Sequence, residues 1–324
     1  MRSYRGMSPR TAAVAFVADR IRRPVADLDL DGIRAARTSL ISQGTLFSAV
    51  TGRVHDDVEI TMGTAPARDG FSIPLRIYRP QPSDGSRSPL PVIVYLHGGG
   101  WVLGNVINYD PLCSLLATKV GAVVVSVDYR LAPEHIAPTA ALDAVDATCW
   151  VASHGEALGA DGLRIGVCGD SAGGNLAAVV AQVMRNHLDR PIRVQALIYP
   201  ATDVTMASPS LEEHRHGAIL DRRAIDAFAD HYCPPGVDRR DPLVSPLFGT
   251  LDGVAPALIQ TADLDPIRDD GSRYAEALRA AGVPTRHTNY LGVPHGFASF
   301  PYATRVGRQQ QWELVTELRA ALAL

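Results

Sequence analysis

The residue best placed to act as a nucleophile is Ser171, at the centre of a Gly-x-Ser-x-Gly pentapeptide that spans residues 169–173. An apolar run at 164–168 precedes this pentapeptide and a helical pattern begins at Ala172, so the context is strand, tight turn and helix. In that context the serine adopts a strained conformation that projects its hydroxyl, and the glycines let neighbouring chain segments pass closely. The pattern therefore predicts a nucleophilic serine rather than a glycine-rich turn with a capping serine.

A serine hydroxyl is a poor nucleophile at neutral pH and needs a base, which itself needs an orienting acid. His295 is the best candidate base among ten histidines, because it follows the strand predicted at 285–290 and so lies where open α/β sheets build their sites. The acid should follow a strand as well, and a run of aspartates follows the predicted strand 257–261. The candidates are Asp263 and Asp265, slightly favoured by their closeness to the strand but not distinguished from each other, and then Asp269 and Asp270.

Three consecutive glycines, Gly98, Gly99 and Gly100, follow His97 directly after a predicted strand. Their backbone N–H groups can face an anion with no side chain in the way. An acyl-transfer enzyme needs such donors where negative charge develops on the carbonyl oxygen, and the N–H of Ala172 would be a further donor. We therefore predict an oxyanion hole here, with His97 as an anchor of the loop rather than as a base.

Two aromatic side chains adjoin these motifs and are predicted to line the substrate site. Trp101 directly follows the glycines, and Phe297 lies two residues beyond the candidate base. The glutamates and histidines between 212 and 216 lack the His-Glu-x-x-His spacing of a zinc site. They are interpreted as a solvated loop, and no metal site is predicted.

Composition narrows the classes of function. The chain has 324 residues, 46% of them hydrophobic, and a net charge of −3, so it can build a large core and is not predicted to bind nucleic acid or an anionic membrane surface. Lys119 is the only lysine in the sequence. This excludes a Gly-Lys-Ser/Thr phosphate loop and leaves no well-placed lysine for a Schiff base.

The cysteines and the hydropathy pattern bear on location. Four widely spaced cysteines argue against a disulfide framework or a zinc site and fit a reducing compartment, so a cytoplasmic location is predicted. No apolar run approaches the roughly 18 residues of a membrane span. Residues 1–23 are interpreted as an amphipathic helix rather than a signal peptide, because Asp19 and Arg20 stand where a cleavage site should be.

The elements that must position these groups follow from the apolar pattern. Short, nearly continuous apolar runs predict strands buried on both faces of a parallel sheet, and the helical patterns between them predict right-handed crossovers. The runs lie at 92–96, 123–127, 164–168, 194–199 and 257–261, with helices between them at about 109–119, 139–153 and 172–187. Further strands are predicted at 58–62, 75–78 and 285–290, and further helices near 9–22, 31–43, 221–232, 270–281 and 304–322.

Taken together, these motifs match the α/β-hydrolases, and the chain resembles the hormone-sensitive lipase family of bacterial carboxylesterases. The resemblance covers about residues 55–320 and rests on the segments 97–101, 128–135, 169–175, 265–269 and 293–297. It implies an α/β-hydrolase fold, with a mostly parallel sheet flanked by helices, and it implies that Asp265 is the acid of the triad. It also implies a helical cap made of residues 1–50 and the irregular excursion 201–250, over a core made of 51–200 and 251–324.

The resulting hypothesis is a serine carboxylesterase in which Ser171, Asp265 and His295 are catalytic and no cofactor is needed. Its partner would be a small ester, and the sequence leaves a homodimer open. Neither cap segment carries a long apolar face, so we expect a preference for acyl chains of about two to eight carbons. An amidase, lactonase or deacetylase on the same triad is the nearest alternative. A non-catalytic small-ligand receptor is an alternative of another class, although receptors of this family lack the catalytic histidine that is present here.

Overall fold

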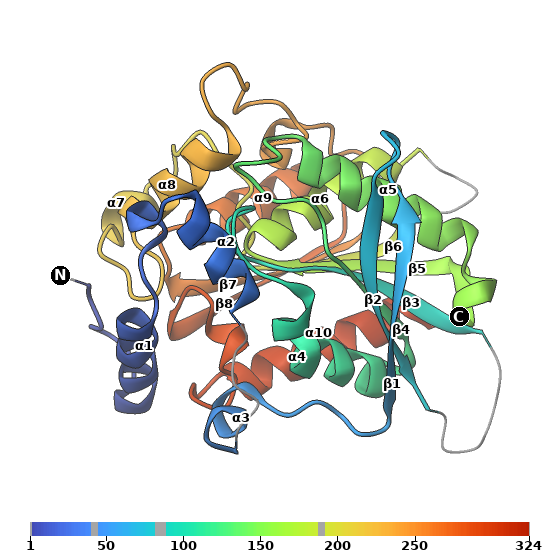
Figure 1. The fold of residues 1–324 in the computed structure, drawn as a ribbon, viewed down its shortest axis with the longest axis horizontal. Coiled ribbons are helices and arrows are strands. Elements are labelled where there is room, and N and C mark those ends of the chain that lie inside the picture. The colour runs from blue at the N-terminus through green and yellow to red at the C-terminus, as the bar shows by residue number, and fades with distance from the viewer. Residues whose placement is uncertain (1, 40–44, 82–88, 187–191, 324) are drawn as a thin grey trace.

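One sheet of eight strands positions the candidate residues in the computed structural model, which describes residues 2–39, 45–81, 89–186 and 192–323 (Figure 1). The strands are β1 (Val58–Pro66), β2 (Ser72–Pro80), β3 (Leu90–Leu96), β4 (Val123–Val127), β5 (Ala160–Asp170), β6 (Ile192–Ile198), β7 (Ala257–Leu264) and β8 (Thr285–Pro294). Their order across the sheet is β1-β2-β4-β3-β5-β6-β7-β8. β1 and β2 form an antiparallel hairpin and β2 pairs antiparallel with β4, whereas every other neighbouring pair is parallel.

The central strands are hydrophobic on both faces. Every residue of β4 is buried, as are the last five residues of β3. Valine and isoleucine dominate these strands, because β-branched side chains pack well on a pleated surface that is covered from both sides. This explains why the strands read as continuous apolar runs in the sequence.

Helices cover the two faces of the sheet. The described helices are α1 (Pro9–Ile21), α2 (Leu30–Thr38), α3 (Thr45–Thr51), α4 (Asp110–Leu116), α5 (Thr139–Ser153), α6 (Ala172–Met184), α7 (Ser210–Glu213), α8 (Arg222–Tyr232), α9 (Arg268–Ala280) and α10 (Gly307–Leu322). On one face, α5, α6 and α9 pack over side chains such as Val94. On the other face, α4 and α10 pack over side chains such as Ile93 (Figure 1).

The N-terminal segment lies against the excursion 201–250. Figure 1 shows α1 and α2 (blue) beside α7 and α8 (yellow to orange) at one end of the sheet. The Asp19 carboxylate at the end of α1 accepts the Ile219 N–H at 3.0 Å, and Asp27 forms an ion pair with Arg223 of α8. The Thr11 hydroxyl donates to the Ala303 carbonyl at 3.2 Å, which fixes α1 close to the segment that follows β8.

The fold class predicted from the sequence is confirmed, and the predicted elements match the observed ones within a few residues at most boundaries. The helix predicted at 139–153 coincides with α5, whereas α3 and α7 were not predicted. α2 ends at Thr38, and the predicted continuation through 40–43 falls outside the described residues. Within the described part of the chain, no helix is both long enough and apolar enough to cross a membrane.

Candidate active site

The candidate nucleophile occupies the turn that joins β5 to α6. Ser171 has a left-handed backbone with φ +55° and ψ −118°, which costs energy for any residue with a side chain. A Cβ on Gly169 would lie 2.3 Å from the Gly173 carbonyl oxygen, and one on Gly173 would lie 1.9 Å from the Leu96 carbonyl oxygen. The two glycines are therefore required by this close packing, as the sequence argument predicts.

Three of the predicted residues meet in one hydrogen-bonded chain. His295 Nε2 lies 2.9 Å from Ser171 Oγ, and His295 Nδ1 lies 2.7 Å from Asp265 Oδ2. Asp265 is fully buried and its second oxygen accepts the Ile267 N–H at 2.9 Å, which fixes the carboxylate in place. With the proton on Nδ1, the histidine donates to Asp265 and leaves Nε2 free to accept the serine proton.

The other aspartates of the candidate run have different partners. Asp263 accepts the backbone N–H groups of Gly292 and Val293, and so holds the end of β8, directly before the histidine. Asp269 accepts the Ser210 N–H, and Asp270 accepts the Ser208 hydroxyl and the Asp203 N–H. Of the four candidates, Asp265 is the one that contacts the imidazole.

The glycine loop follows β3, the strand that pairs with β5 and so ends beside Ser171. Gly99 and Gly100 have φ values of +130° and +61°, which only glycine adopts at low cost. Within the described residues, the N–H groups of Gly99, Gly100 and Ala172 donate to no acceptor of the protein. A Cβ on Gly100 would lie 2.4 Å from the ring of Phe228 on α8, so this ring packs directly on the loop.

The fourth predicted donor is corrected by the structure. The Gly98 N–H donates to Asp170 Oδ1 at 2.9 Å and to the Tyr109 hydroxyl oxygen at 3.0 Å. A donor that is already satisfied inside the protein is not available to a substrate oxygen. The candidate oxyanion donors are therefore reduced to Gly99, Gly100 and Ala172.

His97 anchors the glycine loop. Its ring is fully buried and stacks on Tyr129, whose hydroxyl donates to the His97 carbonyl at 2.6 Å. Its Nδ1 lies 2.8 Å from the Gly98 carbonyl oxygen, to which it donates. Burial lowers the pKa of His97, which favours the neutral ring.

The two predicted aromatic walls are buried. Phe297 has no exposed surface and packs against Tyr199 and Tyr290, so the prediction that it lines the substrate site is wrong. Trp101 is 4% exposed and its ring stacks at 4.6 Å on Tyr232, the last residue of α8. Trp101 therefore packs between the glycine loop and the excursion 201–250, and its ring is not an exposed wall of the substrate site.

Sequence reasoning missed the group that binds Gly98. Asp170 accepts hydrogen bonds from the hydroxyls of Tyr95 and Tyr109 in addition to the Gly98 N–H. Its position next to Ser171 was a local signal. The two tyrosines carried none: the pairing of β3 with β5 brings Tyr95 close to Asp170, and Tyr109 contacts it from the turn before α4.

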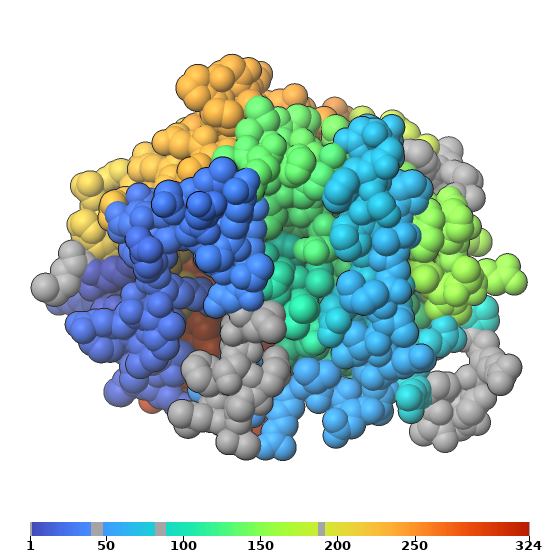
Figure 2. Space-filling view, in the orientation of Figure 1, coloured from blue at the N-terminus to red at the C-terminus, as the bar shows by residue number. Residues whose placement is uncertain are grey.

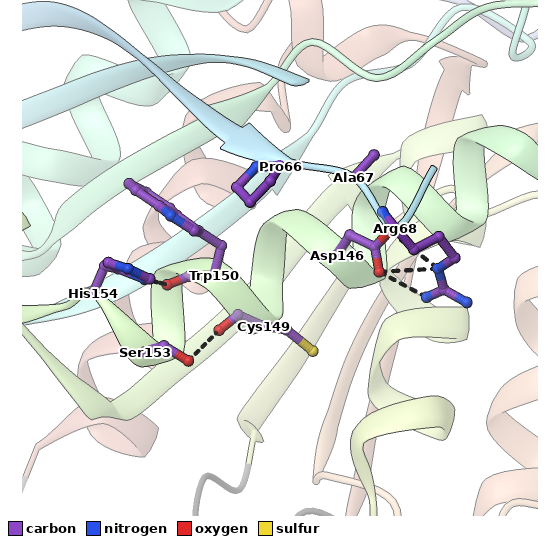
Figure 3. Close-up of a pocket in the computed structure, with 8 residues that line it drawn as sticks. All are labelled: Pro66, Ala67, Arg68, Asp146, Cys149, Trp150, Ser153 and His154. Carbon is purple, nitrogen blue, oxygen red and sulfur yellow. Dashed lines mark hydrogen bonds and ion pairs between the residues drawn. The ribbon is translucent and has the colours of Figure 1, made fainter. Parts of the chain in front are cut away.

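The surface is hollowed beside the N-terminal helices and, separately, between β1 and α5. In Figure 2 the surface next to the N-terminal helices (blue) is hollowed, and atoms of the C-terminal part of the chain (red) are visible at its bottom. Figure 3 shows a separate pocket of about 430 Å³ between the end of β1 and α5, where Arg68 pairs with Asp146 and Trp150 stacks on His154. Ser171, Asp265 and His295 do not line this pocket.

Comparison with protein families and with curated proteins finds one matching family and several similar esterases. A family described as the alpha/beta hydrolase fold matches residues 93–299. A carboxylesterase of Mycobacterium tuberculosis, NlhH, is 42% identical over 260 residues, which are 78% of this chain and 80% of the relative. An ethyl acetate hydrolase of Pseudomonas putida is 39% identical over 251 residues, which are 76% of this chain and 78% of the relative.

Solved structures give the same result over nearly the whole chain. A hyperthermophilic esterase from the archaeon Pyrobaculum calidifontis superposes with a TM-score of 0.85 at 37% identity, and covers 98% of this chain and 99% of its own. A thermostable esterase of Pseudomonas putida superposes with a TM-score of 0.86 at 33% identity, and covers 99% of each chain.

Proposed function

The chain belongs to the alpha/beta hydrolase fold family, and from this premise we propose that it is a serine carboxylesterase that hydrolyses short- to medium-chain esters through an acyl-enzyme on Ser171. The family predicted from the sequence motifs is thereby confirmed. The observation that carries the proposal is the unbroken chain from Ser171 through His295 to Asp265, with distances of 2.9 and 2.7 Å. The carboxylesterase and ethyl acetate hydrolase relatives support it.

The first half of the reaction forms the acyl-enzyme. Ser171 Oγ attacks the ester carbonyl carbon while its proton passes to His295 Nε2. The carbonyl oxygen becomes an oxyanion that the N–H groups of Gly99, Gly100 and Ala172 stabilise. The imidazolium then donates its proton to the leaving alcohol as the bond between carbon and alcohol oxygen breaks, and the acyl group stays on Ser171.

The second half releases the acid. A water molecule gives its proton to His295 and attacks the acyl carbon, and the same three N–H groups hold the second oxyanion. The proton returns from His295 to Ser171 Oγ as the carboxylic acid leaves. Throughout both halves Asp265 keeps the imidazole in one tautomer and stabilises its cationic form.

We propose that residues 1–50 and 201–250 form a cap over this site and set its length preference. The Asp19 contact with Ile219 and the Phe228 ring on Gly100 support this role. A closed pocket gains about 0.8 kcal/mol for each buried methylene until it is full. Activity should therefore increase with acyl length at first and then decrease, with an optimum at about two to eight carbons.

The test is the turnover of a matched aryl ester and aryl amide by the wild type and by Ser171→Ala. Wild type should hydrolyse the ester, and Ser171→Ala should lower kcat by about 10⁴–10⁶-fold at an unchanged melting temperature. A variant that retains a tenth of the wild-type rate would reject Ser171 as the nucleophile. Preferred turnover of the amide would reject the ester as the substrate class, and a single acylation without turnover would favour a receptor.

A further inference from the structure

Asp170 is a buried acid that the reaction steps above do not use. It is the last residue of β5, directly before Ser171, and it is 5% exposed. Among the described residues it has no cationic partner at ion-pair distance, so its burial is not compensated by a salt bridge. Burial raises the pKa of Asp170, which shows that the buried position is unfavourable for the charge.

The carboxylate instead joins three separate segments of the chain. Oδ1 accepts the Tyr95 hydroxyl of β3 at 2.8 Å and the Gly98 N–H at 2.9 Å. Oδ2 accepts the Tyr109 hydroxyl at 3.0 Å, from the turn before α4. A Cβ on Gly98 would lie 2.4 Å from Oδ2, so the carboxylate lies directly against the backbone at Gly98.

The glycine loop needs such a constraint. Three consecutive glycines have more backbone freedom than any other tripeptide, yet oxyanion donors act only when their positions are fixed before the reaction. His97 holds the loop from one side through Tyr129. On the side of Ser171, the loop is held by the Gly98 N–H, which donates to Asp170, the residue before Ser171.

We propose that Asp170 is a positioning residue for the oxyanion hole: its carboxylate binds the Gly98 N–H and thereby holds the Gly99 and Gly100 donors at a fixed distance from Ser171. This inference rests on the proposed function. The role is geometric, because a negative charge beside the oxyanion hole would oppose the charge that develops there. A neutral acceptor of the same shape should therefore replace the carboxylate.

The experiment compares Asp170→Asn with Asp170→Ala. The asparagine can accept from Tyr95 and Gly98 through Oδ1 and can donate through Nδ2 to the Tyr109 oxygen. Alanine removes the acceptor that the three donors share, and the Gly98 N–H then keeps only the Tyr109 oxygen as a partner. Measurements are kcat and KM on a short aryl ester, the pH profile of kcat/KM, and the affinity for a phenylboronic acid, which forms a tetrahedral adduct on the serine.

We expect Asp170→Ala to lower kcat by about 10²–10³-fold, the usual cost of losing an oxyanion donor, with KM changed by only a few-fold. Boronate affinity should fall in parallel with kcat/KM. Asp170→Asn should keep kcat within about tenfold of wild type and leave the pH profile in place. Gly98→Ala, whose Cβ displaces the carboxylate, should reproduce the alanine result from the other side of the contact.

Glu313→Gln is the matched control. Glu313 is a buried carboxylate that also accepts a tyrosine hydroxyl, from Tyr290, but it lies on α10. This variant should lose stability without a change in kcat. If Asp170→Ala fails to fold, Tyr95→Phe combined with Tyr109→Phe weakens the same constraint and should lower kcat and boronate affinity together.

Two results would overturn the proposal. Asp170→Ala with kcat within threefold of wild type would show that the loop needs no such constraint. Asp170→Asn as impaired as Asp170→Ala, with a displaced pH profile, would show that the charge acts on His295 instead. If the wild type hydrolysed no ester, the proposed function would fail while the boronate affinities still tested the positioning role.

Discussion

Replacing Asp265 by asparagine separates the two acids between which the sequence could not choose. In the structure the Ile267 N–H donates to Asp265 Oδ1, and Oδ2 faces His295 Nδ1 at 2.7 Å. An asparagine at this position would direct its carbonyl oxygen to the Ile267 N–H and its amide NH₂ to the histidine. His295 Nδ1 must then act as acceptor, so the imidazole proton moves to Nε2, where it faces Ser171.

The size of the effect follows from this tautomer change. With a proton on Nε2 the imidazole cannot accept the serine proton, although packing and volume are conserved. We expect kcat/KM to fall by about 10³–10⁴-fold, which is about 4–5.5 kcal/mol at about 1.4 kcal/mol per factor of ten. The assay is kcat/KM on a short aryl ester, with the melting temperature measured to show that the fold is retained.

Asp263→Asn is the internal control. Asp263 Oδ1 accepts two backbone N–H groups, from Gly292 and Val293, and an asparagine oxygen can accept both. Its loss of activity should therefore be within about tenfold, since only the charge on a hydrogen-bond acceptor is removed. A larger effect at Asp263 than at Asp265 would refute the assignment of the acid and the argument from the tautomer.

Further predictions concern pH dependence and the N-terminal segment. Burial raises the pKa of Asp270 from 3.8 to about 7. The protonated Asp270 therefore stabilises the fold fully at a pH below its unfolded-state pKa, and this stabilisation is lost as the pH rises through about 7. The melting temperature of Asp270→Asn relative to wild type should therefore be higher at pH 8 than at pH 5, and an unchanged difference would contradict this. Deleting residues 1–30 should lower activity on short esters, because Asp19 in this segment holds Ile219. Asp27→Ala should not lower this activity, because it removes only an exposed ion pair with Arg223. An acyl optimum at about sixteen carbons or more would reject the small closed pocket.

Much of the fold could be predicted because its information is local. Buried parallel strands are continuous apolar runs, and the helix at 139–153 has an apolar face long enough to be recognised. Short helices such as α7, with four residues, carry too few turns for a periodic signal. The candidate nucleophile Ser171 was recognisable for the same reason, since its strand, turn and helix are consecutive in the chain.

The rest of the site depends on contacts that local sequence does not encode. Asp263 and Asp265 both lie near the end of β7, and only the fold of the segment after β8 shows which of them meets His295. The Gly98 N–H donates to Asp170, which is 72 residues away in the sequence and becomes a neighbour because β3 pairs with β5. Burial of Phe297 was not predictable either, because an aromatic residue beside a catalytic motif fits a wall or a core equally well.

The most direct test of the central claim is to find the acyl group on Ser171 during turnover. Enzyme mixed with a short aryl ester is quenched in acid within milliseconds, and its peptides are mapped by mass spectrometry. The acyl mass should be found on the peptide that carries Ser171, in proportion to a burst of released aryl alcohol, and it should be absent from Ser171→Ala. An acyl group on another residue, or ester hydrolysis by Ser171→Ala at the wild-type rate, would contradict the mechanism.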